Sequence, residues 1–267
     1  TESNVREAAR DAAVLARQAN PDPDFIALPA PDDHAAKQVP GLWDDAVAEL
    51  STDDVMAAVS DNISDGLAAA PDAVYQGAVG AHAGVKALAN SRGVGITSRS
   101  TMYDLGFSAL LKRSGEVGMF YEMAMGRRLA DVDPRGVTRK AAIEAEKYLG
   151  GTSVPSKPID IVLGPMASYS FVMELAAHCN AESIQRRRSF MTDRLGEIIG
   201  SECLTLWDDG LIEAGLSSGA WDGEGARRRR VTLIENGRFV SMLHNSYTAG
   251  KAGVENTGHG SMSGSVS

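Results

Sequence analysis

The spacing of apolar and polar residues predicts helices in the first 70 residues of the chain. Residues 3–19 carry small apolar side chains at helical spacing and stop before Asn20-Pro21, which predicts a helix. Residues 20–50 contain five prolines and predict an extended connector. The Ser-Thr-Asp-Asp sequence at 51–54 favours a helix cap, so a second helix is expected to run to about Ala70.

The pattern becomes typical of β-strands at Asp72. More than fifty residues alternate small, apolar and polar side chains, with turn signals at 90–93 and 113–116. We predict an antiparallel meander of three or four strands here. A helix from Pro134 to Leu149 follows, ended by two glycines.

The last third of the chain mixes both patterns. IDIVLGP at 159–165 predicts a short buried strand, and residues 168–186 predict a helix. From Cys203 onward the pattern is again of the β type. Asn236-Gly237 favours a tight hairpin turn between strands at about 229–235 and 238–244. Its inward apolar positions are expected to be Val231, Leu233, Phe239 and Met242.

This order of elements predicts an α+β fold, because strands and helices follow one another without strict βαβ alternation. We expect an antiparallel sheet with packed helices, followed by a second mixed β/α unit. The expected domains are residues 1–150 and 151–267.

Composition narrows the function classes. The net charge of −9 and pI of about 5.1 oppose binding to phosphate backbones, so nucleic-acid binding by the arginine runs 186–188 and 227–230 is not the favoured interpretation. A face paired with carboxylates is the simpler reading of both runs. No stretch of about 18 apolar residues predicts a membrane span. Two cysteines, Cys179 and Cys203, imply no disulfide framework and favour a cytoplasmic setting.

The most specific candidate for chemistry lies in FVMELAAHCNAE at 171–182. Glu174, His178 and Glu182 are four residues apart and would share one face of a continuous helix. One imidazole and two carboxylates are acceptable ligands for a hard metal ion. A polar helix face without metal is the competing interpretation, and spacing alone favours it. No serine-nucleophile elbow or nucleotide-binding glycine motif occurs.

Several short stretches together resemble the TldD/PmbA family. They are NSRG (90–93), LGP (163–165), SFMTDRLGE (189–197), LTLWDDG (204–210), WDGEGARRRR (221–230) and VTLIENGRFVSMLHNSYTAGKAGVENTGHG (231–260). The resemblance extends from about residue 50 to the end and implies a cytoplasmic metalloprotease whose members are also called modulators of DNA gyrase. It also implies that the chain is a fragment that lacks the family's N-terminal strands and C-terminal end.

The family's TldD branch binds its metal on a helix with the motif HExxxH, and a cysteine near the C-terminus is a further ligand. In this chain Met173 stands in place of the first histidine, whereas Glu174 and His178 match the other two residues. The family's cysteine has no counterpart. The resemblance is therefore closer to the PmbA/TldE branch, which shares the fold without the motif.

Three hypotheses follow from the resemblance and the residues. The favoured one is a non-catalytic PmbA/TldE-like subunit that forms a homo- or heterodimer with a TldD-like subunit and acts on unfolded or flexible peptides. In that case no metal is expected in this chain, and zinc or iron belongs to the catalytic partner. The second is an active metallopeptidase with Glu174 and His178 as catalytic residues and His178 and Glu182 as metal ligands. The third is a non-enzymatic module that binds peptide or nucleic acid.

Overall fold

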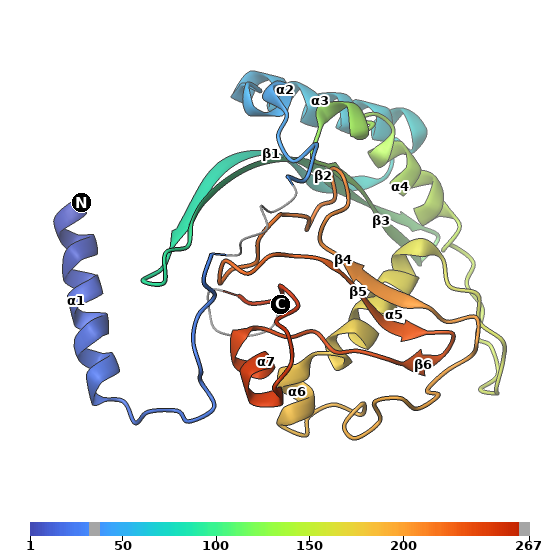
Figure 1. The fold of residues 1–267 in the computed structure, drawn as a ribbon. Coiled ribbons are helices and arrows are strands. Elements are labelled where there is room, and N and C mark those ends of the chain that lie inside the picture. Colours follow the sequence, from blue (N-terminus) through green and yellow to red (C-terminus); the bar gives the residue numbers. More distant parts are fainter. Residues whose placement is uncertain (32–37, 262–267) are drawn as a thin grey trace.

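Two three-stranded antiparallel sheets organise the chain, and two of the long helices cover the first (Figure 1). The computed structural model describes residues 1–31 and 38–261. In chain order the elements are α1 (Glu2–Gln18), α2 (Asp45–Ala48), α3 (Thr52–Ala69), β1 (Val74–Ala89), β2 (Gly95–Arg113), β3 (Glu116–Gly126), a 3-10 turn (Leu129–Asp131), α4 (Val137–Glu146), α5 (Pro165–His178), α6 (Ala181–Gln185), β4 (Leu206–Asp209), β5 (Arg230–Glu235), β6 (Arg238–Phe239) and α7 (Ser246–Ala252). The predicted α+β class is confirmed.

The first sheet is the predicted meander, with three strands in the order β1-β2-β3. Every second side chain of β2 between Thr101 and Leu111 is buried, as the two-residue period of a strand requires. Phe107 and Leu111 on this face are fully buried, and α4 contacts both β2 and β3. The opposite face of β2 is only half-buried. One face of the meander therefore forms the core beneath α3 and α4.

Local signals set the starts of the helices on this sheet. Ser51 accepts a hydrogen bond from the Asp54 backbone N–H, and the Asp54 carboxylate accepts one from the Ser51 N–H, which completes a capping box. The expected helix from 51 to about 70 is confirmed as α3. The helix predicted over 134–149 is shorter, because Gly136 adopts a left-handed conformation (φ 77°) immediately before α4 begins.

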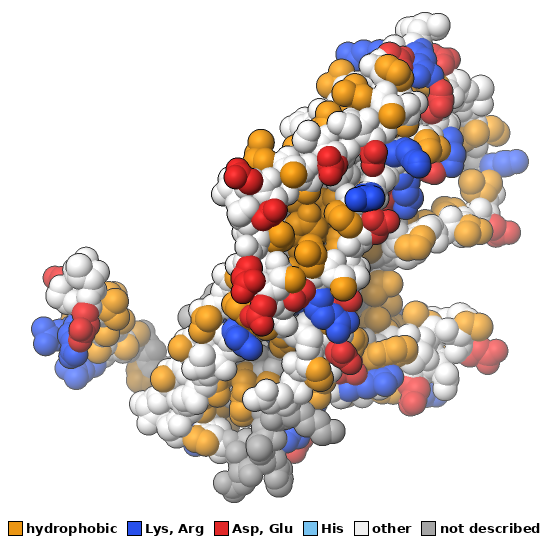
Figure 2. Space-filling model, turned by 90° about the horizontal axis from the view of Figure 1, so that it is seen from above, with side chains coloured by type: hydrophobic (Ala, Val, Ile, Leu, Met, Phe, Trp, Pro, Cys, Tyr) orange, Lys and Arg blue, Asp and Glu red, His pale blue; other side chains and the backbone are white. Residues whose placement is uncertain are grey.

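The predicted first helix is present as α1, and all of its side chains are exposed. Figure 2 shows it end-on as a separate group of atoms at the left, with charged side chains on one side and apolar side chains on the other. Within residues 1–31 and 38–261, no helix combines the length and apolar character needed to cross a bilayer.

The second sheet contains the predicted hairpin. Asn236 and Gly237 have φ values of 48° and 77°, which the tight turn between β5 and β6 requires. Val231, Leu233 and Phe239 are buried in its core, and Met242 packs against it half-buried. The second strand is shorter than predicted. The Val240 N–H still donates to the Leu233 carbonyl of β5 at 2.9 Å, but farther along the chain the Leu243 N–H donates to the Cys179 carbonyl instead.

Two predictions for residues 159–186 are wrong. Residues 159–164 form no strand and lie exposed, and Val162 is 99% exposed. The helix expected over 168–186 begins at Pro165 and is interrupted after His178. The side-chain oxygen of Asn180 accepts from the Glu182 N–H at 2.9 Å and so caps a new helix, α6.

Candidate functional site

The α5 helix brings the predicted pair Glu174 and His178 together. Glu174 Oε1 lies 3.3 Å from His178 Nε2, as expected for side chains one turn apart. The Glu174 side chain is 76% exposed and that of His178 is 27% exposed, so water screens the pair. No residue of α5 is buried. The helix therefore presents the pair at a surface rather than within a closed site.

The rest of the His178 environment fixes the ring from the other side. Its Nδ1 lies 3.3 Å from the Ser189 hydroxyl oxygen, and the Phe190 ring centroid is 4.5 Å from the imidazole centroid. The Ser189 hydroxyl donates to the His178 carbonyl at 2.7 Å, so it accepts rather than donates at the ring. Ser189 and Phe190 therefore contact the imidazole in addition to Glu174.

Glu182 does not join this pair. The interruption at Cys179 and Asn180 places Glu182 in α6, where its carboxylate lies 2.9 Å from Arg186 Nη2. Continuous helical spacing was the sole reason to group Glu182 with His178, and the structure removes it. The side chain of Met173, at the position before Glu174, is a thioether and 51% exposed.

The donors on α5 do not fit a metal centre. A catalytic zinc ion takes three protein ligands and keeps one open position, whereas α5 supplies one imidazole and one exposed carboxylate. In the described part of the chain, no group of three His, Cys, Asp or Glu side chains converges in a way that could hold a metal ion. Cys179 is buried, and burial raises the pKa of its thiol to about 11, which disfavours the thiolate that binds metals.

A second polar cluster, which sequence reasoning missed, lies in the C-terminal part. His259 Nε2 is 2.9 Å from Asp208 Oδ1, and His259 Nδ1 is 2.9 Å from the Thr257 hydroxyl. That hydroxyl also accepts from the His244 N–H at 2.6 Å, and His244 Nδ1 lies 3.3 Å from the Thr248 hydroxyl. His244, Thr248, Thr257 and His259 are all buried. Two of the segments, Trp-Asp-Asp-Gly and Thr-Gly-His-Gly, occur in the stretches that resemble the family, but nothing in the sequence indicated that they meet.

The hydrogen bonds and pKa shifts of this C-terminal cluster indicate that it holds neighbouring segments of the chain together. The hydrogen bond from His259 lowers the pKa of Asp208, and burial lowers the pKa of His244. Burial raises the pKa of Asp222, although its carboxylate accepts hydrogen bonds from three backbone N–H groups, including that of Gly260 at 2.6 Å. These bonds tie residues 257–260 to β4 and to the 222–226 turn.

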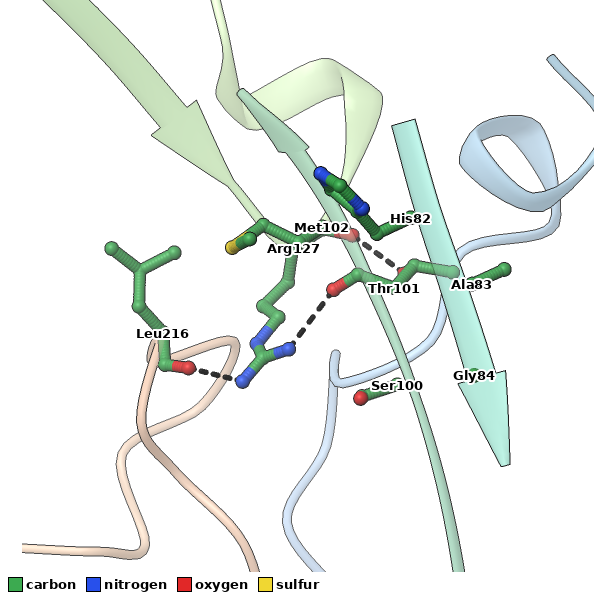
Figure 3. A pocket seen from close by; sticks show the side chains of 8 residues that line it. All are labelled: His82, Ala83, Gly84, Ser100, Thr101, Met102, Arg127 and Leu216. Carbon is green, nitrogen blue, oxygen red and sulfur yellow. Dashed lines mark hydrogen bonds between the residues drawn. The ribbon is translucent and has the colours of Figure 1, made fainter. Parts of the chain in front are cut away.

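A shallow cavity of about 360 Å³ lies where β3 ends and the β1–β2 hairpin continues alone (Figure 3). It is lined by His82, Ala83, Gly84, Ser100, Thr101, Met102, Arg127 and Leu216. Arg127 donates to the carbonyls of Thr101 (3.1 Å), Gly215 (3.3 Å) and Leu216, and burial lowers its pKa. The guanidinium therefore joins the first sheet to the 215–216 loop, and its donors are occupied by carbonyls.

The two arginine runs are largely engaged by carboxylates and by an aromatic ring. Arg187 pairs with Asp193 at 2.7 Å, and Arg229 pairs with Glu255 at 2.6 Å. The Arg230 guanidinium lies 4.6 Å above the centre of the Trp207 ring. These contacts agree with the carboxylate-paired face that the sequence suggested.

The sequence of the chain is similar to those of known proteins. Residues 45–149 match the PmbA/TldA metallopeptidase central domain, and residues 156–267 match the PmbA/TldA metallopeptidase C-terminal domain. An uncharacterized protein of Methanocaldococcus jannaschii is 31% identical over 189 residues, which are 70% of this chain and 44% of that protein. The metalloprotease PmbA of Escherichia coli O157:H7 is 27% identical over 184 residues, which are 68% of this chain and 41% of that protein. The chain thus spans less than half the length of these relatives.

Solved structures share the fold at lower sequence identity. A proposed modulator of DNA gyrase from Bacteroides thetaiotaomicron superposes with a TM-score of 0.85 at 20% identity, over 96% of this chain and 60% of that one. TldE from Thermococcus kodakarensis superposes with a TM-score of 0.83 at 24% identity, over 100% of this chain and 61% of that one.

Proposed function

Because the chain belongs to the PmbA/TldD metallopeptidase family, we propose that it is a non-catalytic, PmbA/TldE-like subunit of a cytoplasmic metalloprotease complex that acts on flexible peptides. The observation that carries the proposal is the ligand set of α5. Met173 replaces a hard donor, Glu182 pairs with Arg186, and the remaining Glu174–His178 pair is open to water. Two donors on one helix hold a divalent ion weakly.

The exposed surface of α5 supports the proposal of a partner subunit. Its side chains Tyr169, Phe171 and Met173 are 65%, 67% and 51% exposed, and the preceding Ile161 is 70% exposed. A helix that carries apolar side chains on all of its sides is normally covered by other protein. We propose that a TldD-like subunit covers it and supplies the metal, zinc or iron, with its own ligands. A homodimer is the alternative assembly.

Co-purification of the protein from its native host, followed by a peptide-cleavage assay, tests the complex directly. In the reconstituted complex, we expect the His178→Ala variant to keep both peptide cleavage and the bound zinc or iron, because His178 is not a ligand in this proposal. Asp193→Asn, which removes an exposed ion pair elsewhere, is the matched control. Loss of cleavage together with one metal ion per copy of this chain would overturn the proposal and favour an active site built on Glu174 and His178.

A further inference from the structure

The turn between β5 and β6 contains the one Asn-Gly pair of the sequence, Asn236-Gly237. An asparagine before glycine is prone to deamidation, because glycine has no side chain to hinder attack by its own backbone nitrogen. In this reaction the Gly237 nitrogen loses its proton and bonds to the side-chain carbonyl carbon of Asn236. Ammonia leaves with that proton, and a cyclic succinimide remains. Water then opens the ring to aspartate or to isoaspartate, in which the former side-chain carbon lies in the backbone.

The side chain of Asn236 does not hinder this reaction. Asn236 is exposed, and within residues 1–31 and 38–261 its side-chain amide makes no hydrogen bond. Asn90 and Asn245 differ, because their side-chain oxygens accept from the backbone N–H groups of Val94 and Thr248. Protection of Asn236 must therefore come from the backbone of the turn.

The attacking nitrogen is held by a hydrogen bond to a distant segment. The Gly237 N–H donates to the Leu204 carbonyl at 2.8 Å. Succinimide formation removes the proton from this nitrogen, so the bond to Leu204 must be lost before the ring can close. The Gly237 carbonyl in turn accepts from the N–H groups of Ile199 at 2.8 Å and of Gly200 at 3.3 Å. Both backbone groups of Gly237 are thus tied to residues 199–204.

Close packing also prevents rotation of the turn. Gly237 is buried with a φ of 77°, and a Cβ placed on it would lie 2.4 Å from the Gly200 carbonyl oxygen and 2.7 Å from that of Ser201. On the other side, the Asn236 N–H donates to the Thr205 hydroxyl oxygen at 3.2 Å. The peptide between Asn236 and Gly237 is therefore fixed. Its nitrogen cannot approach the side-chain carbonyl carbon until residues 199–205 separate from the turn.

We propose that Asn236 is a deamidation site that the folded turn protects and that becomes reactive when residues 199–205 separate from it. The rate in the folded chain is then the intrinsic rate multiplied by the fraction of molecules in which the turn is open. The reaction needs water and no metal or partner subunit. Its test therefore leaves the proposed subunit role untouched.

The isoaspartate product does not fit the hairpin. Glu235 pairs with Arg238 directly across the two-residue turn, and Ile234 pairs with Phe239. Isoaspartate adds a carbon atom to the backbone of the turn, whereas a two-residue hairpin turn requires a specific backbone geometry. A chain that is modified while open therefore does not re-form the β5–β6 pairing and does not bury Phe239. Isoaspartate formation makes that opening irreversible.

Deamidation of the wild-type chain, folded in buffer or unfolded in urea at the same pH and temperature, tests the protection. Trypsin releases residues 231–238, and liquid chromatography with mass spectrometry quantifies asparagine, aspartate and isoaspartate at position 236. We expect the reaction to be at least about tenfold slower in the folded chain, which corresponds to an opening free energy of about 1.4 kcal/mol or more. Equal rates in the two states would overturn the proposal.

A variant that loosens the turn tests whether these hydrogen bonds give the protection. Thr205→Val removes the acceptor of the Asn236 N–H, and Thr152→Val changes another exposed threonine and is the matched control. We expect Thr205→Val to speed up deamidation of the folded chain about threefold or more, with the rate in urea unchanged. Thr152→Val should match the wild type. Identical folded-state rates in Thr205→Val and the wild type would contradict the assigned cause of protection and overturn the proposal.

Refolding tests the consequence for the hairpin. Wild-type chain kept in urea until part of it is deamidated is diluted into buffer, and size-exclusion chromatography separates folded from unfolded molecules. We expect isoaspartate at position 236 to be concentrated in the unfolded fraction. Asn236→Asp changes the charge but not the length of the backbone, and it should refold as the unmodified chain does. Equal isoaspartate contents of the two fractions would overturn the irreversible loss of the hairpin.

Discussion

The α5 helix and the C-terminal polar cluster each hold a histidine beside a carboxylate, yet they differ in nearly every physical respect. His178 and Glu174 lie on one exposed helix, one turn apart. His259 and Asp208 come from segments 51 residues apart, and His259 is buried within a chain of hydrogen bonds. The family motif matches the first pair, whereas the buried network of hydrogen bonds surrounds the second.

This difference shows that a matching motif and a working site are separate properties. The α5 pair retains two residues of a metal motif, but its carboxylate is exposed to water, and the His178 ring contacts Ser189 and Phe190 outside the helix. The C-terminal cluster matches no metal motif, but its buried groups must all find hydrogen-bond partners. Mutations should therefore have small effects on the stability of the chain in α5 and large effects in the C-terminal part.

The two regions should differ most in the free energy of unfolding that is lost when a large apolar side chain is truncated to alanine. Phe239 is fully buried beneath the hairpin, so Phe239→Ala is expected to lower the free energy of unfolding by about 3–5 kcal/mol. Phe171 on α5 is 67% exposed, so Phe171→Ala should change it by less than about 0.5 kcal/mol. Urea unfolding followed by tryptophan fluorescence measures both. A loss in Phe171→Ala as large as that in Phe239→Ala would show that α5 packs against the rest of the chain.

Removing the two histidines should give the next largest difference. His259→Ala removes one hydrogen bond from Asp208 and one from Thr257 and is expected to cost about 1–3 kcal/mol of stability. His178→Ala should cost less than about 1 kcal/mol, because its partner Glu174 remains hydrated. His259→Gln offers an amide toward Asp208 and should recover part of the loss. Equal midpoints of thermal unfolding for the two alanine variants would show that the two histidines contribute equally to stability, contrary to this prediction.

The pH dependence of stability should reflect the C-terminal cluster. Burial lowers the folded-state pKa of His244 below its ordinary value of 6.5, so below that pH the unfolded chain binds more protons than the folded one. The contribution of His244 to stability is therefore present above pH 6.5 and is lost as the pH falls, by at most about 1.4 kcal/mol per pH unit. Urea unfolding of the wild type and of His244→Asn between pH 7.5 and 5.5 measures this slope. An unchanged slope in His244→Asn would exclude this residue as its source.

Neutralising Glu174 should have the smallest effect. Exposed ion pairs contribute about 0–1 kcal/mol, so Glu174→Gln is expected to shift the free energy of unfolding by less than about 0.5 kcal/mol. The shift should vanish in 1 M salt, where exposed charges are screened. Ser168→Ala on the same helix serves as a control, because its hydroxyl donates within the first turn at 2.8 Å to the Gly164 carbonyl. A large, salt-independent loss would place Glu174 in a tighter environment than the structure gives.

Predictions from local chemistry were the accurate ones. The helix cap at 51–54 and the Asn236-Gly237 turn depend on neighbouring residues alone, and the structure confirms both. The alternation of side chains after Asp72 predicted an antiparallel meander, because successive side chains of a strand alternate between faces, and the structure confirms it with three strands. The closeness of Glu174 and His178 follows from the helical repeat in the same way.

The errors occurred where a distant segment decides the outcome. A strand needs a partner to satisfy its backbone groups, and residues 159–164 pair with none in the described part of the chain, so their apolar pattern was not sufficient. The interruption after His178 depends on Leu243, whose carbonyl accepts from the Ala181 N–H at 3.0 Å. Nothing within residues 168–186 specifies that contact.

The sequence by itself determined the α+β class, the helix caps, the hairpin turn and the incomplete metal motif, because each depends on residues a few positions apart. Only the tertiary structure decided that Glu182 leaves the α5 pair and that His259 meets Asp208. Each of these depends on hydrogen bonds between segments tens of residues apart. Such bonds form once burial has brought the segments together, and side-chain periodicity does not encode their partners.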